Sequence, residues 1–290
     1  SYKESESGQI LEEGISEAGA MSSFTAAGMA YSTVGKPTIP FYIYYSMFGF
    51  QRVGDQIWCA ADSRARGFLL GATAGRTTLN GEGLQHQDGH SLLTATTVPN
   101  CVAYDAAFAY EIGIIIKEGL RRMYENNEDL FYYLTLYNEN YSMPPIPKNS
   151  DEGIIKGIYR FKKATKPVVR LIGSGSIMQQ VISADKILSE MGINCEIWSA
   201  TSFGGLQRDA MECERWNLLN PTKKAKIPYI SKVMKNKEMV TIATTDHIKA
   251  VPKMIERWIP GKYITLGTDG FGRSDTRENL RKFFEISAEH

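Results

Sequence analysis

Apolar stretches and amphipathic stretches alternate along the chain, and this order predicts an α/β protein. Runs rich in β-branched and aromatic residues predict strands over residues 38–48, 67–72, 101–104, 131–137, 195–201, 239–245 and 263–267, and at the start of 167–176. Helical spacing predicts helices over residues 9–30, 49–66, 106–124, 176–191, 247–258 and 275–285. We therefore expect two three-layer α/β/α units with mostly parallel sheets.

A break in this alternation marks a boundary between two units. Residues 138–152, NENYSMPPIPKNSDE, hold three prolines together with Asn, Ser and Lys. This composition is typical of a linker between domains. The sequence therefore predicts a first domain over residues 1–150 and a second over residues 151–290.

Composition narrows the classes of protein that the chain can represent. Of its 290 residues, 43% are hydrophobic and 22% are charged, so a full core can form. The net charge of +1 argues against nucleic-acid binding through bulk charge. The cysteines are far apart, which fits a reducing compartment and no structural zinc site; they are Cys59, Cys101, Cys195 and Cys213.

Neither a membrane span nor a secretory signal is expected. The longest apolar run, at 39–50, is too short to cross a bilayer. The first residues, SYKESESGQ, are polar and lack the apolar region of a signal peptide. We therefore expect a cytoplasmic protein without membrane or nucleic-acid partners.

Candidate chemistry gathers in residues 76–90, RTTLNGEGLQHQDGH, which we call the histidine loop. It contains two of the four histidines, His86 and His90, with Asp88 between them and Glu82 just before. It has no apolar period and several glycines, so it is expected to be a loop between strands, where binding and catalytic groups tend to lie. By contrast, GSGS at 173–176 lacks the third glycine of a dinucleotide fingerprint and is interpreted as a tight turn rather than an anion site.

Three further pieces carry a resemblance to a known family: GISE (14–17), FYIYYSMFGFQR (41–52) and the histidine loop itself. Together they resemble the pyrimidine-binding domain of the homodimeric pyruvate dehydrogenase E1 component, a thiamine-diphosphate enzyme of the transketolase superfamily. The resemblance covers essentially the whole chain, continuing through NENY (138–141), GSGS (173–176), CERWN (213–217) and GTDGFGRSDTRENLR (267–281). It implies a transketolase-like pyrimidine-binding domain followed by a transketolase C-terminal domain.

The resemblance also implies a reaction and roles for five residues. The reaction is the decarboxylation of pyruvate with transfer of the acetyl unit to a lipoyl group on the E2 partner. Glu17 would donate a hydrogen bond to N1′ of the cofactor's aminopyrimidine, Ile15 would support its bent form, and Phe48 would stack on it. Tyr45 and His86 would reach the substrate. Asp88 and His90 are expected, at most, to shape the loop.

The resemblance implies that part of each site lies elsewhere. The family binds Mg²⁺ and the diphosphate through a GDG…NN segment in an N-terminal domain. Here the TDG at 268–270 and the NN at 126–127 are in the wrong order. We therefore expect the chain to be a C-terminal portion of a longer polypeptide, missing a little at its end, and inactive alone.

Two other interpretations remain open at this stage. A metal-dependent hydrolase could use His86, Asp88 and His90, since alternate residues of an extended strand share a side. Alternatively, the chain could be a non-catalytic assembly domain, because its second half shows no obvious catalytic set.

Overall fold

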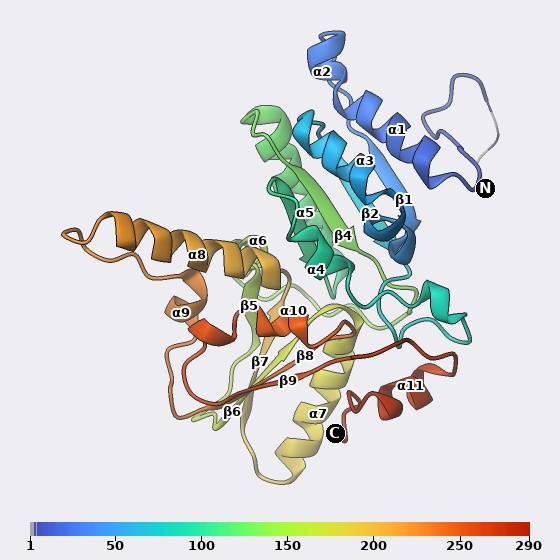
Figure 1. Ribbon diagram of the computed structural model, residues 1–290. Coiled ribbons are helices and arrows are strands. Elements are labelled where there is room, and N and C mark those ends of the chain that lie inside the picture. The colour runs from blue at the N-terminus through green and yellow to red at the C-terminus, as the bar shows by residue number, and fades with distance from the viewer. Residues whose placement is uncertain (1–2, 4) are drawn as a thin grey trace.

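The computed structural model describes residue 3 and residues 5–290, arranged as two α/β units that follow one another along the chain (Figure 1). Residues 1, 2 and 4 belong to the polar start from which no signal peptide is expected, and they lie outside the described residues. Within the part described, no helix is both long enough and apolar enough to span a bilayer.

The first unit is built on a four-stranded sheet in which neighbouring strands pair in parallel. Its spatial order is β1–β2–β4–β3, with β1 at Phe41–Tyr45, β2 at Phe68–Ala72, β3 at Cys101–Asp105 and β4 at Phe131–Thr135. Successive side chains of a strand point to opposite faces, and both faces of the central strands are buried. Thus Leu69 joins one core cluster, whereas Phe68 and Leu70 join another.

Helices cover both faces of this sheet. Helices α1 (Glu17–Gly28) and α3 (Phe50–Asp62) pack together and bury Met21 and Ile57 in the cluster that contains Leu69. Helix α5 (Ala109–Leu120) buries Ile115 in the cluster on the other face. Shorter elements complete the unit: α2 (Ala30–Thr33), α4 (Ser91–Ala95), a π-helical turn at Arg121–Glu125, and 3₁₀ turns at Ser46–Phe48 and Leu84–His86.

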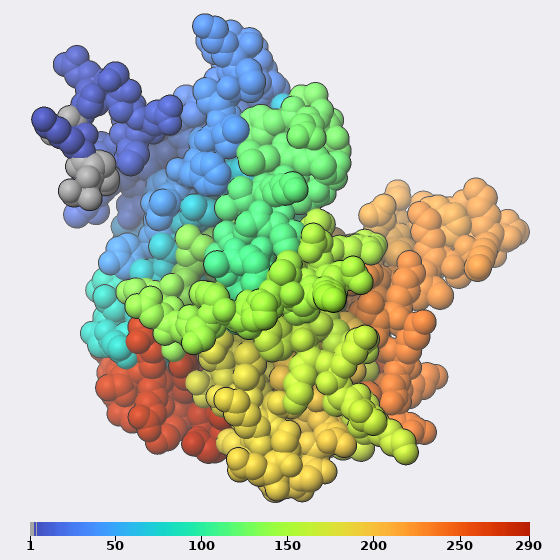
Figure 2. All heavy atoms as spheres, turned by 180° about the vertical axis from the view of Figure 1, so that it is seen from behind, coloured from blue at the N-terminus to red at the C-terminus, as the bar shows by residue number. Residues whose placement is uncertain are grey.

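The second unit contains a five-stranded sheet of order β5–β7–β6–β8–β9. Strand β5 pairs antiparallel with β7, and the other neighbours pair in parallel; the strands are β5 (Ile158–Lys162), β6 (Val169–Gly173), β7 (Cys195–Ala200), β8 (Val240–Thr244) and β9 (Tyr263–Leu266). Its helices are α6 (Asp151–Lys156), α7 (Met178–Glu190), α8 (Phe203–Leu219), α9 (Tyr229–Val233), α10 (Ala250–Lys253) and α11 (Arg277–Phe283), with 3₁₀ turns at Gly175–Ile177 and Glu256–Trp258. Helix α8 and the loop after it project from the body of the molecule (Figure 2).

The two units meet through the carboxyl ends of their strands. At the end of β3, Asp105 N–H donates to the carbonyl of Thr201, just after β7, over 2.7 Å. Just after β8, the carbonyl of Asp246 accepts from Arg76 N–H over 3.2 Å. Since loops at these strand ends carry ligands in open α/β sheets, the junction is the part of the fold most suited to hold a site.

The predicted order of elements is confirmed, but several boundaries and elements were wrong. The helix expected over 9–30 begins only at Glu17, because Gly14 adopts a φ of 65° and Ser16 caps the helix by accepting from Gly19 N–H. The helix expected over 247–258 is broken, since Ile248 N–H donates to the carbonyl of Gly89 across the junction instead of to its own chain. Strand β5 and helices α4, α6, α8 and α9 had no counterpart among the predicted elements.

The passage between the two sheets occupies residues 136–157, which include the predicted boundary near 150. The boundary itself stays a prediction.

Candidate functional site

The first part of the candidate site is the amino end of helix α1. Glu17 is the first residue of this helix, where a negative charge is favoured by the helix dipole. The Tyr42 hydroxyl donates to the carbonyl of Glu17 over 3.5 Å. Burial, and then the charge of Glu17, raises the pKa of Tyr42 to about 12. Both observations place Glu17 against Tyr42 of β1.

Aromatic rings form the second part. Tyr45 ends β1, Phe48 lies in the 3₁₀ turn that follows, and His86 lies in the 3₁₀ turn of the histidine loop. The His86 ring centroid is 5.0 Å from that of Tyr45 and 5.4 Å from that of Phe48, which it meets edge-on. The sequence separates these rings by about forty residues, and the parallel pairing of β1 with β2 brings them together.

Arg52 of helix α3 joins the two parts. Its Nη1 lies 3.0 Å from Oε1 of Glu17, and its guanidinium carbon lies 4.1 Å from the centroid of the Phe48 ring. The Glu17 side chain is 18% exposed, so it is held in the cluster and does not point freely into solvent. We call Glu17, Tyr45, Phe48, Arg52 and His86 the site cluster.

Four of the five predicted site residues therefore lie together, and the fifth does not contribute to the cluster. Ile15 is 99% exposed, two residues before Glu17. Its role as a support for a bound cofactor stays a prediction. Its side chain leaves apolar surface exposed to solvent.

The H-x-D-x-H arrangement is not a metal site, so the metal-dependent hydrolase was a wrong alternative. His86 Nδ1 faces Glu82 Oε2 at 2.9 Å, and His90 Nε2 contacts the amide of Gln51. Asp88 is used by its own loop, because it accepts from the backbone N–H groups of His90 and Ser91 over 3.1 and 3.0 Å. Across residue 3 and residues 5–290, no three His, Cys, Asp or Glu side chains gather as metal ligands.

The pKa shifts of Asp88 and His90 agree with a structural role for Asp88. Burial raises the pKa of Asp88, but the charge of His247 and hydrogen bonds from Ser91 and His90 outweigh it, so the net shift is downward. Burial lowers the pKa of His90 despite the nearby charge of Asp88. Asp88 is thus a buried carboxylate that shapes the loop.

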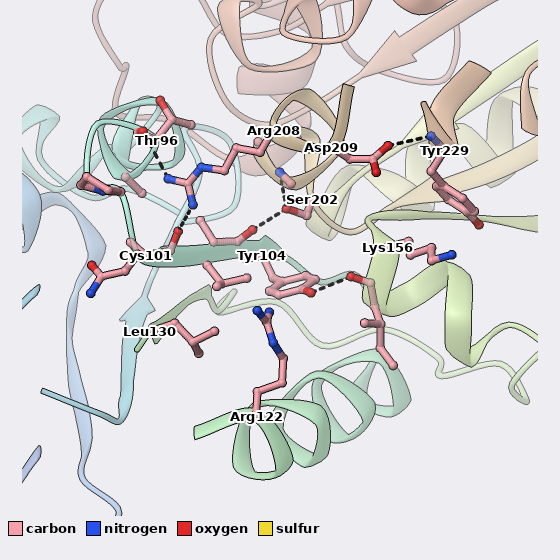
Figure 3. Close-up of a pocket in the computed structure, with 18 of the residues that line it drawn as sticks. Thr96, Cys101, Tyr104, Arg122, Leu130, Lys156, Ser202, Arg208, Asp209 and Tyr229 are labelled. Carbon is pink, nitrogen blue, oxygen red and sulfur yellow. Dashed lines mark hydrogen bonds between the residues drawn. The ribbon is translucent and has the colours of Figure 1, made fainter. Parts of the chain in front are cut away.

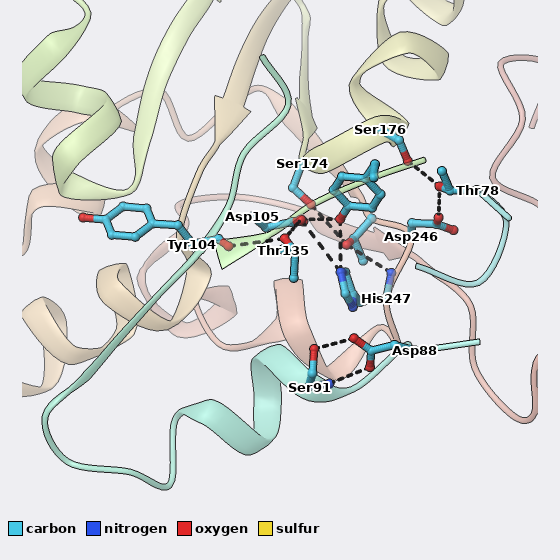
Figure 4. Close-up of polar contacts among 12 residues, drawn as sticks. Thr78, Asp88, Ser91, Tyr104, Asp105, Thr135, Ser174, Ser176, Asp246 and His247 are labelled. Carbon is cyan, nitrogen blue, oxygen red and sulfur yellow. Dashed lines mark hydrogen bonds and ion pairs between the residues drawn. The ribbon is translucent and has the colours of Figure 1, made fainter. Parts of the chain in front are cut away.

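Sequence reasoning missed a second polar cluster, at the junction of the two units. We call its members, Thr77, Thr78, Asp105, Asp246 and His247, the domain seam, and all are buried. Figure 4 labels Thr78, Asp105, Asp246 and His247. Asp246 accepts from Thr77 and Thr78, and His247 Nε2 lies 3.8 Å from Asp105 Oδ1. The sequence did contain an indication of this cluster, because polar residues follow the apolar strand at 240–244 in a parallel sheet. These residues match no known motif, so they were not singled out.

Charged groups inside the seam shift one another's pKa values. Burial raises the pKa of Asp246, against the effect of hydrogen bonds from Thr78 and Thr77. Burial lowers the pKa of His247, but Asp105, Asp88 and Asp246 outweigh it, so the pKa of His247 lies above its usual value. For Asp105 the lowering effects of His247, Thr135 and Tyr137 exceed the raising effect of burial.

The GSGS turn at 173–176 is used by the same junction. Gly175 has a φ of 51°, and a Cβ there would lie 2.3 Å from the hydroxyl of Tyr137. The hydroxyl of Ser174 donates to Thr245 over 3.1 Å, and that of Ser176 contacts Thr78 at 2.8 Å. The tight turn predicted from the sequence is therefore part of the packing between the units.

A separate cavity of about 420 Å³ lies between the units near the start of helix α8 (Figure 3). It is lined in part by Tyr104, Arg122, Lys156 and Arg208. None of the five predicted site residues lines it, and the Arg208 guanidinium donates to the carbonyls of Cys101, Thr96 and Val98. We therefore place the candidate site at the site cluster.

The fold of this protein is transketolase-like. Transketolase from Campylobacter jejuni superposes with a TM-score of 0.66 at 18% identity, covering 91% of this chain and 36% of that chain. A split gene transketolase, described as an inactive beta4 tetramer, gives a TM-score of 0.63 at 17% identity and covers 95% of this chain and 79% of its own. At these identities the likeness shows the fold alone.

Sequence comparison gives the family. Residues 1–144 match the pyruvate dehydrogenase E1 component middle domain, and residues 157–287 match the transketolase-like C-terminal domain. The two parts of the chain therefore belong to these two domain families. Proteins named pyruvate dehydrogenase E1 component are 54% identical in Pseudomonas aeruginosa, over 98% of this chain, and 53% identical in Escherichia coli, over all of it. The chain spans 33% of the length of both relatives.

Proposed function

We propose that this chain forms part of the E1 component of a pyruvate dehydrogenase complex. The reaction is the thiamine-diphosphate-dependent decarboxylation of pyruvate, with transfer of the acetyl unit to a lipoyl-bearing E2 acetyltransferase. The observation that carries the proposal is the meeting of Glu17, Tyr45, Phe48 and His86 in one cluster. Identity above 50% with proteins of that name, along the whole chain, supports it.

The residues of the cluster suit the aminopyrimidine part of thiamine diphosphate. Phe48 offers an aromatic ring, Glu17 offers a carboxyl group that Arg52 links to that ring, and Ile15 offers exposed apolar surface two residues before Glu17. When bound, the cofactor supplies the electron sink that pyruvate needs to lose carbon dioxide. Glu17 would hold a proton on its carboxyl group and donate it in a hydrogen bond to N1′ of the pyrimidine.

This role has a consequence for the pair of Glu17 and Arg52. A protonated carboxyl has lost most of its attraction for a guanidinium group, so proton uptake on Glu17 weakens the 3.0 Å contact. Arg52 can then remain stacked on Phe48 without its carboxylate partner. We expect cofactor binding and separation of this pair to occur together.

Tyr45 and His86 would handle the substrate. Tyr45 is 45% exposed and His86 is partly exposed, so both can reach a small 2-oxo acid bound above the cluster. The Glu82 carboxylate lies 2.9 Å from Nδ1 of His86, and Nε2 would exchange a hydrogen bond with substrate. Asp88 and His90 take part only by holding the loop.

The proposal extends to partners that the structure does not contain. We propose a homodimer, a cytoplasmic location, and Mg²⁺ that accompanies the diphosphate and is bound by residues outside this chain. We also propose that these 290 residues are inactive when tested alone.

The test is Glu17→Gln in the full-length protein, with Glu12→Gln as the matched control. Glu12 is an exposed carboxylate on the segment just before α1. Pyruvate-dependent release of carbon dioxide should fall about 10²–10⁴-fold in the Glu17 variant, as for loss of a positioned proton donor, and stay within about twofold in the control. Unchanged turnover in Glu17→Gln would favour the non-catalytic assembly domain instead.

A further inference from the structure

The histidine loop belongs to the first unit by sequence, yet the second unit holds it along its length. Near its start, Arg76 N–H donates to the carbonyl of Asp246 over 3.2 Å. Further along, Gly81 N–H donates to the carbonyl of Asp275 over 3.0 Å. At its end, the carbonyl of Gly89 accepts from Ile248 N–H over 2.8 Å. The position of His86 is therefore set from outside its own unit.

Asp246 makes the densest set of these contacts. Its Oδ1 accepts from the backbone N–H of Thr77 over 3.0 Å and from the Thr77 hydroxyl over 2.7 Å. Its Oδ2 accepts from the Thr78 hydroxyl over 2.6 Å, and Thr78 in turn contacts the hydroxyl of Ser176 at 2.8 Å. All four residues are fully or almost fully buried. Hydrogen bonds to a buried carboxylate are among the stronger kinds, so this contact is a rigid one.

The backbone next to the loop is shaped to admit the carboxylate. Gly75 has a φ of 88°, and a Cβ at this position would lie 2.1 Å from Oδ2 of Asp246. The chain can pass this closely only because residue 75 has no side chain. The carboxylate therefore fills a space that the first unit leaves for it.

We propose that Asp246 is a positioning residue for the site cluster. By fixing the start of the histidine loop, it places His86 against Tyr45 and Phe48 from the opposite unit. This inference rests on the proposed function, because His86 has a substrate role only there. A misplacement of about 1 Å can cost roughly 10²-fold in rate, so a residue that touches no substrate can still control turnover.

The main experiment compares Asp246→Asn and Thr78→Val in the full-length protein with Thr241→Val. Thr241 is the matched control, a fully buried threonine on β8 whose hydroxyl accepts from Arg170 Nη1 over 3.1 Å, within the second unit. Hydrogen–deuterium exchange should become at least about tenfold faster in peptides from residues 76–90 in the first two variants, and unchanged there in the control.

Measurements of activity then distinguish a positioning role for Asp246 from a general contribution to stability. We expect Asp246→Asn to lower kcat for pyruvate about 10–10²-fold, with a smaller change in KM. In a His86→Gln background the same substitution should cost less than about twofold, because the group that it positions is gone. Equal losses in both backgrounds, or unchanged exchange of residues 76–90, would overturn the proposal.

The two readouts keep this inference distinct from the proposed function. If His86→Gln alone left pyruvate turnover unchanged, the substrate role of His86 would be wrong. Exchange of the loop would still report whether Asp246 orders it. Faster exchange with unchanged kcat in Asp246→Asn would overturn the positioning role while leaving the proposed function in place.

Discussion

The site cluster and the domain seam differ in their exposure to solvent, although the histidine loop contributes residues to both. Thr77 and Thr78, at one end of the histidine loop, are fully buried and bonded to Asp246. His86, at the other end, is partly exposed and meets mainly aromatic rings. The same fifteen-residue segment is thus a structural element at its start and a reactive surface near its end.

This difference has a physical cause. A buried polar group costs free energy unless it is hydrogen-bonded, and the Asp246 carboxylate of the second unit is satisfied by donors that Thr77 and Thr78 supply from the first unit. An exposed group has no such requirement, because water satisfies it until a ligand replaces the water. Rigid, hydrogen-bonded contacts therefore suit the part of the seam around Asp246, and open, loosely paired groups suit the site cluster.

The largest effect should come from Gly75→Ala, which brings a methyl group against Asp246. We expect a loss of local stability of about 3 kcal/mol, since roughly 1–2 kcal/mol of backbone strain adds to an overpacking cost of similar size. The amides of Ile248 and Thr268, which both take part in hydrogen bonds near the seam, should then exchange on the order of 10²-fold faster.

Gly81→Ala is the control for this prediction. Gly81 lies in the histidine loop, six residues after Gly75, and has a φ of 65°, but a Cβ there would meet nothing within 4 Å. It shares the backbone strain and lacks the contact with the carboxylate. Equal acceleration of exchange in the two variants would mean that close packing against Asp246 contributes nothing to the seam.

The next effect should come from His86→Gln, and it should appear in activity rather than in stability. We expect turnover of pyruvate by the full-length protein to fall about 10²-fold, which is near 2.7 kcal/mol of activation free energy. Exchange of residues 76–78 should stay unchanged, because His86 makes no hydrogen bond to the seam. Loss of protection at Thr77 in this variant would show that the two ends of the loop are not separable.

Four members of the site cluster, all except Arg52, were predicted from the sequence because they lie in recognisable contiguous motifs. Glu17 falls in GISE, Tyr45 and Phe48 in one strand and turn, and His86 in the histidine loop. Their roles were expected because these motifs resemble a known family, and not from the chemistry of each residue in isolation. Most strands were predicted for a similar reason, since buried parallel strands are continuous apolar runs.

The seam was not predictable because its contacts join residues that are far apart in the chain. Asp246 and Thr77 are 169 residues apart in the sequence, and the residues around each of them give no indication of the contact. The helix expected to start near residue 9 failed for a different reason. Apolar residues do recur there at helical spacing, but the positive φ of Gly14 and the N-cap at Ser16 keep the helix from starting before Glu17. These local conformations outweigh the apolar periodicity.

A smaller effect should appear as a pH dependence of the seam. The pKa of His247 is raised in the folded protein by Asp105, Asp88 and Asp246, beyond the opposing effect of burial. The resulting stabilisation is complete below the ordinary histidine pKa of about 6.5 and is lost as pH rises through the higher pKa of the folded state. Each unit of separation between the two values corresponds to about 1.4 kcal/mol.

His247→Gln should remove this dependence. Protection of the Thr268 amide, which donates to the carbonyl of His247, should fall with rising pH above about 6.5 in the parent protein and stay flat in the variant, after correction for intrinsic exchange. A parent protein whose protection rose over the same range would show that His247 is held neutral.

The smallest effect on stability should come from Arg52→Met, which tests whether the contacts of the site cluster are as weak as their exposure suggests. The Arg52 side chain is 51% exposed, so its pair with Glu17 is screened by water, and its loss should change the stability of the fold by less than about 1 kcal/mol. Met retains an apolar contact with Phe48 but removes the charge. Because Glu17 then has no competing cation, thiamine diphosphate should bind the full-length protein up to about fivefold more tightly.

The control for this last prediction is Arg64→Met, which removes a more exposed pair, with Asp129 at 3.5 Å, away from the site cluster. It should match Arg52→Met in thermal stability and differ from it in cofactor affinity, measured by calorimetric titration. Weaker binding in Arg52→Met would mean that the arginine helps the site by stacking on Phe48 more than it hinders by pairing with Glu17. In that case the contacts of the site cluster are built to hold their geometry before a ligand arrives, and the contrast with the seam is one of solvent exposure alone.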